Sequence, residues 1–147
     1  MMRETILCVR SRVEPPARIN GILIQQMIPS GVEMMIGVRV DPLFGPLILV
    51  GLGGVRVELV KDTALQLAPV NHEEAMGLLD SLRGQRLLDG FRGGATVDRA
   101  ALADTVVRVS ELAADLAGEL AELDINPLIC INSSIIAVDA LAVRKKT

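Results

Sequence analysis

Apolar residues in the first half of the chain fall in short runs, several of which alternate with polar residues as β-strands do. From Gly21 to Pro69 these runs are separated by turn-forming residues, such as Pro29-Ser30-Gly31 and Gly53-Gly54. We therefore expect five strands, at residues 22–28, 33–40, 47–52, 55–60 and 64–68. Because no stretch between them is long enough to form a helix, neighbouring strands should pair antiparallel.

The spacing of apolar residues along the chain changes after Pro69. Apolar residues then recur every three or four positions, first in a segment that begins near His72 and again over residues 99–118. Asp98 is suited to cap the longer helix, because its carboxylate can accept hydrogen bonds from the free N–H groups of the first turn. The apolar side of that helix is predicted to carry Leu102, Val106, Val109, Ala113 and Leu116, and its polar side Asp104, Arg108, Glu111 and Asp115.

The remaining residues are predicted to form a loop, a basic terminus and three more strands. Residues 84–94 are rich in glycine, include Arg92-Gly93-Gly94, and are expected to form a loop. Basic residues at 144–146 are interpreted as a solvated terminus. Three more strands are predicted near the C-terminal end, at residues 121–125, 128–131 and 134–138. The pattern therefore predicts the α+β class, with an antiparallel sheet on which two helices pack.

Composition narrows the classes of function. A chain of 147 residues fits one domain, and a mean hydropathy of +0.44 excludes disorder. The net charge is −3, so the chain lacks the excess of basic residues that would neutralise nucleic-acid phosphates. It also has no Trp or Tyr on which bases could stack. We predict no nucleic-acid partner. Every apolar run is too short to span a bilayer, and we predict no membrane interaction.

The N-terminal residues and the thiols indicate a cytoplasmic protein. Residues 1–20 carry charges throughout and lack the apolar stretch of a signal peptide. Residues 1–16 are expected to be a tail or a strand that needs a partner. Cys8 and Cys130 lie far apart without metal-type spacing, so we interpret them as reduced thiols. His72 is the only histidine, and a catalytic dyad has little support.

A candidate cation site lies in the last hairpin. If Asn132-Ser133 is a two-residue turn, Asn126 lies directly opposite Asp139, and their side chains share one face of the sheet. An amide oxygen and a carboxylate are hard ligands of the kind that Mg²⁺ takes. Because side chains alternate between the two faces of a strand, Glu122 and Asp124 point to the same face as Asn126. On these residues alone, an ordinary hairpin in which Asn126 opens a turn is the more common explanation.

A second candidate is the glycine run Gly51-Leu52-Gly53-Gly54. It lacks the G-x-G-x-x-G spacing of a dinucleotide site, and a strand pattern follows it where a helix N-terminus would be needed. The chain also has no Gly-Lys-Ser/Thr of a P-loop. The run is therefore interpreted as a tight turn or a bulge. The loop at Arg92 is interpreted as solvated, although one arginine on a mobile loop could also close over an anion.

Taken in order, the motifs resemble the ATP-grasp domain of NDP-forming acyl-CoA synthetases, similar to succinyl-CoA synthetase β chains. The first group of motifs comprises residues 21–27, Glu33, Ile36-Gly37-Val38, Asp41-Pro42 and Phe44-Gly45-Pro46. The second comprises residues 51–54, Glu58, Asp62, Ala68-Pro69, Leu88, Gly90, Arg92-Gly93 and 122–128. The resemblance spans about residues 17–143. It implies a single partial ATP-grasp domain over residues 1–147, namely the metal-binding half.

The resemblance also implies roles for individual residues. Gln26, Met27 and Ile28 match the hinge whose backbone bonds adenine, and Glu33 matches the acidic residue that meets the ribose hydroxyls. Asn126 and Asp139 match the magnesium ligands, so the resemblance and the hairpin register point to the same pair. Asp124 belongs to the same motif. The implied cofactors are Mg²⁺ and ATP (or ADP).

The implied activity is that of an acid–thiol ligase, in which phosphoryl transfer couples a carboxylic acid to CoA. The implied partners are the remaining half of the ATP-grasp domain and a CoA-binding subunit or domain. Residues 1–20 contain nothing that replaces the upstream half, so the isolated chain is expected to be inactive and either to form a homo-oligomer or to require a partner. The alternative is a non-catalytic ATP-grasp remnant that acts as an assembly or binding module.

Two positions depart from the family pattern. His72 does not match the histidine that relays the phosphoryl group. After Asp139-Ala140 the pattern continues with arginine, whereas this chain has Leu141. The change removes a basic group near the expected phosphates.

Overall fold

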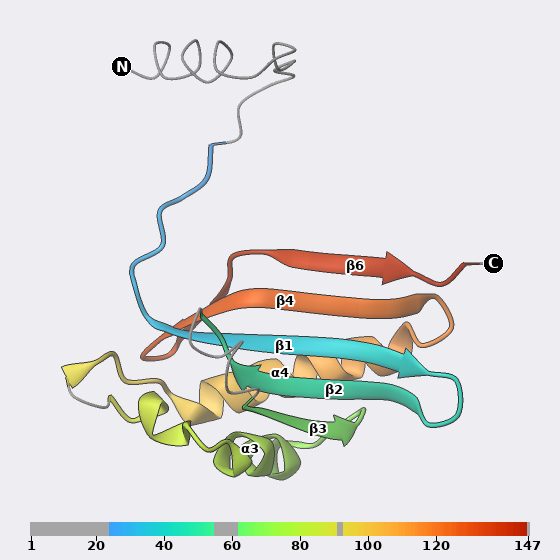
Figure 1. Ribbon diagram of the computed structural model, residues 1–147, viewed down its shortest axis with the longest axis horizontal. Helices are drawn as coiled ribbons and strands as arrows, with labels where there is room; N and C mark the ends of the chain where they lie inside the picture. Colours follow the sequence, from blue (N-terminus) through green and yellow to red (C-terminus); the bar gives the residue numbers. More distant parts are fainter. Residues whose placement is uncertain (1–23, 55–61, 91–92, 147) are drawn as a thin grey trace.

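One antiparallel sheet organises the described part of the chain, which in this computed structural model comprises residues 24–54, 62–90 and 93–146 (Figure 1). The sheet runs in the order β3-β2-β1-β4-β5, and β6 pairs with β4 at the same edge as β5. Every pair of neighbours is antiparallel. The strands are β1 (Val32–Asp41), β2 (Gly45–Leu52), β3 (Thr63–Leu67), β4 (Leu120–Ile131), β5 (Ser134–Ala137) and β6 (Ala140–Arg144).

Two helices, α3 (His72–Ser81) and α4 (Arg99–Asp115), lie on one face of this sheet (Figure 1). The side chain of Asn71 accepts from the N–H of Glu74, and the side chain of Glu74 accepts from the N–H of Asn71, which forms a capping box at the start of α3. Asp98 accepts from the first N–H groups of α4, as predicted. The predicted α+β architecture, with an antiparallel sheet and two helices, is confirmed.

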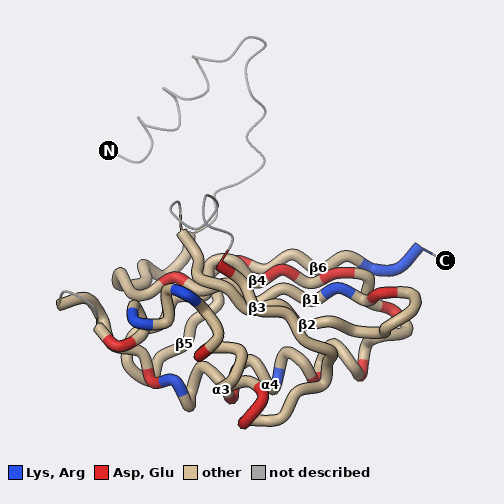
Figure 2. The backbone as a smooth tube through the Cα atoms, turned by 60° about the horizontal axis from the view of Figure 1, so that its bottom comes forward, with Lys and Arg blue, Asp and Glu red and all other residues tan. Residues whose placement is uncertain are grey.

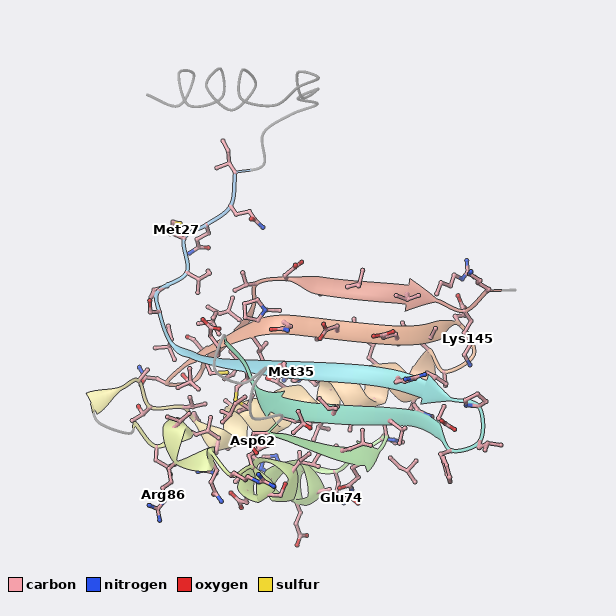
Figure 3. The ribbon with its side chains drawn as sticks, viewed as in Figure 1. Met27, Met35, Asp62, Glu74, Arg86 and Lys145 are labelled. Carbon is pink, nitrogen blue, oxygen red and sulfur yellow. The ribbon has the colours of Figure 1, made fainter. Side chains whose placement is uncertain are left out.

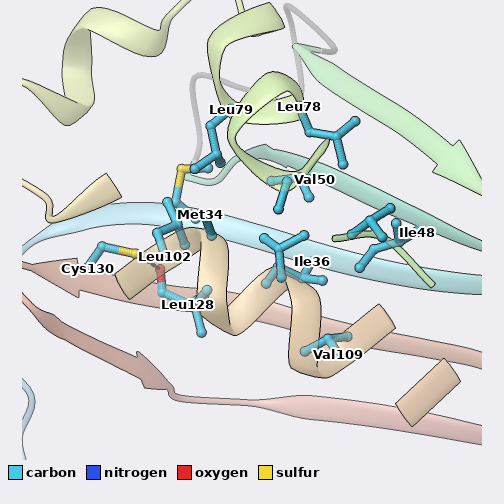
Figure 4. Close-up of a cluster of buried hydrophobic side chains, with 14 of the residues drawn as sticks. Met34, Ile36, Ile48, Val50, Leu78, Leu79, Leu102, Val109, Leu128 and Cys130 are labelled. Atoms are coloured by element: carbon cyan, nitrogen blue, oxygen red, sulfur yellow. Dashed lines mark hydrogen bonds between the residues drawn. The ribbon is translucent and has the colours of Figure 1, made fainter. Parts of the chain in front are cut away.

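The core fills the space between the helices and the sheet (Figure 4). β1 and β2 alternate, so that Met34, Ile36 and Ile48 face the helices and are fully buried. The predicted apolar side of α4 is buried from Leu102 to Ala113, and its four predicted polar residues are exposed. Leu116 is 38% exposed, because α4 ends at Asp115, three residues earlier than expected.

The short 3₁₀ helix η1 (Gln85–Leu88) is held against the core by charge-assisted hydrogen bonds. The carboxylate of Asp62 accepts from the backbone N–H groups of Arg83 and Gly84, at 2.9 and 2.8 Å. Arg99 donates to Asp89, Asp80 and the carbonyl oxygen of Gln85. The region predicted as a loop is therefore ordered from 84 to 90 by contacts with elements distant in sequence.

Several predicted strands differ from the structure. Residues 24–28 are irregular where a strand over 22–28 was expected, and the strand predicted at 55–60 lies outside the described residues. Residues 121–125 and 128–131 belong to one strand, because β1 pairs with both segments. The register between β1 and β4 shifts between Met34 and Ile36, where β4 carries one extra residue and contains Pro127, which has no N–H to donate. Arg144 belongs to β6, which the sequence did not predict, and Lys145 follows it, its N–H donating to Glu119.

Candidate nucleotide and metal site

The hairpin register predicted from the Asn132-Ser133 turn is confirmed. β4 and β5 pair from Leu128–Ala137 to Ile131–Ser134, and Asn132 has the positive φ of 50° that a tight turn requires. The same register continues into β6, from Ile125–Ala140 to Glu122–Val143. Asn126 thus lies opposite Asp139, and its N–H donates to the carbonyl oxygen of Asp139 at 3.2 Å.

The side chains at this position are open to solvent. Asn126 and Asp139 are both exposed, and Oδ1 of Asp139 accepts from the N–H of Ala140 at 2.9 Å, which leaves its second oxygen available. Asp124, two residues before Asn126 on the same face, has an Oδ1 atom that is buried and has no hydrogen-bond partner. An amide oxygen and two carboxylates therefore lie along this part of the hairpin.

The residues predicted to bind nucleotide lie in a groove of about 380 Å³ beside the hairpin. Met27 projects from the segment that leads into β1 and is 89% exposed (Figure 3). The lining comes from that segment, from β1 and from the hairpin: residues 25–31, Glu33, Pro127, Ile129 and Val138. The groove thus brings Gln26, Met27, Ile28 and Glu33 next to the chain neighbours of Asn126 and Asp139.

The glycine run contributes to this region by a close backbone approach. The N–H of Gly53 donates to the carbonyl oxygen of Glu33 at 2.6 Å, and Gly54 has a φ of +87°. A Cβ on Gly54 would lie 3.0 Å from Oε2 of Glu33. Glycine is therefore required here to let the chain turn directly against Glu33. The sequence indicated a tight turn but not its neighbour.

A second hollow, of about 560 Å³, lies on the face of the sheet opposite the helices. No local sequence pattern predicts this hollow, because its residues are spread over four strands. Its apolar wall comes from Leu47, Leu49 and Leu65, and its polar residues are Arg39, Asp41, Glu122 and Asp124. The N–H groups of Leu43 and Phe44 donate to the Asp41 carboxylate and lower its pKa.

In residues 24–54, 62–90 and 93–146, no three His, Cys, Asp or Glu side chains cluster as a metal site would require. The pair Asn126 and Asp139 contributes one carboxylate and one amide, and magnesium sites commonly use one or two carboxylates together with water and substrate phosphates. Within the same residues, no helix is long and apolar enough to cross a membrane.

A family model of the ATP-grasp domain matches residues 2–143 of the chain. The chain belongs to the ATP-grasp family of ADP-forming acyl-CoA synthetases. It is 40% identical over 137 residues to the ADP-forming acetate–CoA ligase I subunit beta of Pyrococcus furiosus, which covers 93% of the chain and 59% of that subunit. The resemblance inferred from the sequence motifs is confirmed.

Solved structures of the dinucleotide-forming acetyl-coenzyme A synthetase 1 of Ca. Korarchaeum cryptofilum have the same fold. The form with coenzyme A and Ca-AMPCP matches with a TM-score of 0.83 and 40% identity, over 97% of this chain and 62% of that one. The form with coenzyme A and Mg-AMPPCP matches with a TM-score of 0.75 and 38% identity, over 80% of this chain and 55% of that one. The chain thus spans a little over half the length of these relatives.

Proposed function

We propose that the chain is the ATP- and Mg²⁺-binding half of an ADP- or NDP-forming acyl-CoA synthetase. The observation that supports this most directly is the opposition of Asn126 and Asp139 in the hairpin, beside the groove that holds residues 26–28 and Glu33. The crystallised relative from Ca. Korarchaeum cryptofilum binds Mg-AMPPCP. Under this proposal, the metal and the nucleotide bind at adjoining parts of one surface.

The donor chemistry of the hairpin fits a magnesium ion. Asn126 offers an amide oxygen and Asp139 a carboxylate, and both side chains are exposed. Asp124 adds a buried oxygen without a hydrogen-bond donor, which a nearby cation would satisfy. We assign Asn126 and Asp139 as ligands and Asp124 as their neighbour in the site. A magnesium ion bound there would neutralise negative charge on the nucleotide phosphates.

The groove suits the base and the ribose. The exposed segment of Gln26, Met27 and Ile28 offers backbone groups outside any strand, and these groups are available to bond adenine. Glu33 offers a carboxylate that accepts hydrogen bonds from the ribose hydroxyls. None of the described residues that line this groove is Lys or Arg. We propose that the remaining half of the ATP-grasp domain supplies positive charge for the phosphates.

We further propose that the complete enzyme couples a carboxylic acid to CoA through phosphoryl transfer, as an acid–thiol ligase. The relative from Pyrococcus furiosus is one subunit of an acetate–CoA ligase. The partners of this chain would accordingly be the upstream half of the domain and a CoA-binding subunit or domain.

A chimaera tests the assignment of Asp139. This chain would replace the matching segment of the Pyrococcus furiosus subunit within the complete enzyme. We expect ADP-forming acyl-CoA synthesis, and Asp139→Ala should lower kcat by roughly 10- to 100-fold. The control is Asp115→Ala, an exposed carboxylate on α4, which should leave kcat unchanged. Equal turnover by the Asp139→Ala and Asp115→Ala chimaeras would contradict the assignment.

One observation favours the second candidate, a non-catalytic remnant. Leu141 lies directly opposite Asp124, at the position where the family pattern has an arginine. Leucine cannot donate to Oδ1 of Asp124, and a basic group near the phosphates is absent at this position. A remnant would show no turnover in the chimaera and no Mg²⁺-dependent nucleotide binding. Recovery of both in the Leu141→Arg chimaera would assign the loss to this one substitution.

A further inference from the structure

The outer edge of β6 is the feature that carries a further inference. β6 lies at the margin of the sheet, and among the described residues only β4 pairs with it (Figure 1). All five of its residues are exposed, and Leu141 and Val143 are 63% and 41% exposed. An edge of this kind presents unpaired N–H and C=O groups to any strand that fits it.

Two hydrogen bonds determine which backbone groups of β6 face outward. The carbonyl oxygen of Asp139 accepts from Asn126, and the N–H of Lys145 donates to Glu119, so both residues direct their backbone toward β4. Because this direction alternates along a strand, Leu141 and Val143 also face β4, whereas Ala142 faces outward. Ala140 agrees with this parity, since its N–H donates to its neighbour Asp139 and not to β4.

Basic side chains often protect an exposed sheet edge, but those of Arg144 and Lys145 form hydrogen bonds with residues just before β4. Arg144 donates to the carboxylate of Glu119 at 3.1 Å, and Nζ of Lys145 donates to the carbonyl oxygen of Ala117 at 2.6 Å. Figure 2 shows basic residues at the C-terminal end of β6. The middle of the edge is therefore unprotected.

We infer that β6 pairs antiparallel with β6 of a second copy of this chain, about a twofold axis at Ala142. In this register, Ala142 exchanges backbone hydrogen bonds with Ala142 of the other copy. On the open face of the sheet, Leu141 lies opposite Val143, and Asp139 lies opposite Lys145, whose ammonium group leaves Ala117 to reach it in the dimer. Every contact on that face is then apolar with apolar or acid with base, and on the other face Ala142 lies opposite Ala142 and Ala140 lies opposite Arg144.

The self-complementary order of these residues argues for a second copy over an unrelated strand. A five-residue strand pair falls short of the about 1,200–2,000 Å² that stable complexes bury, so the dimer should be weak and dependent on concentration. This inference does not rest on the proposed function. Because the proposed metal site uses Asp139, the test is made without Mg²⁺ and without nucleotide.

Sedimentation velocity across a concentration series measures the dimer. We expect a concentration-dependent monomer–dimer equilibrium for the unmodified chain. Ala142→Pro should remain monomeric, because proline removes the outward N–H without removing a hydrogen bond to β4. Ala142→Val retains the N–H and should still dimerise. A strictly monomeric unmodified chain would overturn the inference, and so would dimerisation of a folded Ala142→Pro variant.

A charge swap tests the register and does not depend on a proline variant. Asp139→Lys and Lys145→Asp each place like charges opposite one another, and each should weaken its own dimer by roughly 3- to 10-fold. An equimolar mixture of the two variants restores opposite charges at both positions and should form a heterodimer of about the original affinity. Thermal unfolding checks that both variants are folded. If the mixture associates no better than either variant alone, the register is wrong.

Discussion

At the scale of single residues, Cys130 shows how burial changes the chemistry of a side chain. It lies on β4 with no exposed surface, and its sulfur is 3.8 Å from the carbonyl oxygen of Leu128 (Figure 4). Burial raises the pKa of its thiol to about 12, from an ordinary value of 9.0. The sequence predicted a reduced thiol on an apolar strand, and at this residue the structure agrees, since Cys130 is a free buried cysteine.

In a Cys8→Ser variant, which keeps Cys130 as the only cysteine, we expect a thiol reagent to react only through unfolding. The labelling rate should follow the unfolded fraction as denaturant increases. Between about pH 9 and pH 12 the unfolded thiol ionises while the folded one stays neutral, so stability should fall by roughly 1 kcal/mol per pH unit. Chemical denaturation measures this, with Cys8→Ser/Cys130→Ala as the control without a thiol. Rapid labelling that ignores denaturant would contradict the expectation.

At the scale of elements, the connection between α3 and η1 is fixed by contacts that a helix or strand pattern does not encode. Asp62 precedes β3, and its carboxylate accepts from the N–H groups of Arg83 and Gly84. Gly84 packs so closely that a Cβ there would meet the Leu52 side chain and lie 3.2 Å from Oδ2 of Asp62. The position is therefore restricted to glycine by packing, since its φ of −90° is ordinary.

Two glycine-to-alanine substitutions should have opposite effects on stability. Gly84→Ala is expected to destabilise the chain by about 1–3 kcal/mol, because the added methyl group overpacks against Leu52 and Asp62. Gly77→Ala, inside α3 with open space around it, should stabilise by about 0.5–1 kcal/mol through helix propensity. Urea unfolding of both variants provides the comparison. A neutral Gly84→Ala would show that the connection adjusts and that this packing is not restrictive.

The whole molecule presents one covered and one uncovered face. Both helices pack on the face of Met34 and Ile36, whereas Leu49, Leu65 and Met35 line the open hollow on the other face. Leu65 is 59% exposed. A sheet with apolar residues on both faces is usually covered on both. This arrangement agrees with the proposed requirement for the remaining half of an ATP-grasp domain.

We expect the isolated chain to form no acyl-CoA with ATP and any carboxylic acid, because the proposed activity requires the remaining half of the ATP-grasp domain and a CoA-binding subunit or domain. Thioester formation followed by chromatography measures this, with the complete chimaera as the positive control. ATP-dependent thioester production that scales with the amount of purified chain would contradict the expectation.

Features that depend on residues close together in the chain were predictable from the amino-acid sequence alone. The change in the spacing of apolar residues, from alternation to every three or four positions, predicted α3 and α4. Asp98 predicted the start of α4. The two-residue turn at Asn132-Ser133 was enough to place Asn126 opposite Asp139, because a hairpin register is set locally by its turn. The ordered motifs identified the family, although the resemblance and not the periodicity assigned roles to Gln26, Met27, Ile28 and Glu33.

Features that require contact between segments far apart in the sequence could be seen only in the folded chain. β1 pairs with β4 on both sides of Pro127, and this pairing joins two predicted strands into one. Residues 140–144 form the strand β6 because they pair with residues 120–125 of β4. The groove forms because residues 25–28 lie beside Pro127 and Val138. A local pattern records which face of a strand is apolar, but which strand edges meet depends on packing across the whole chain.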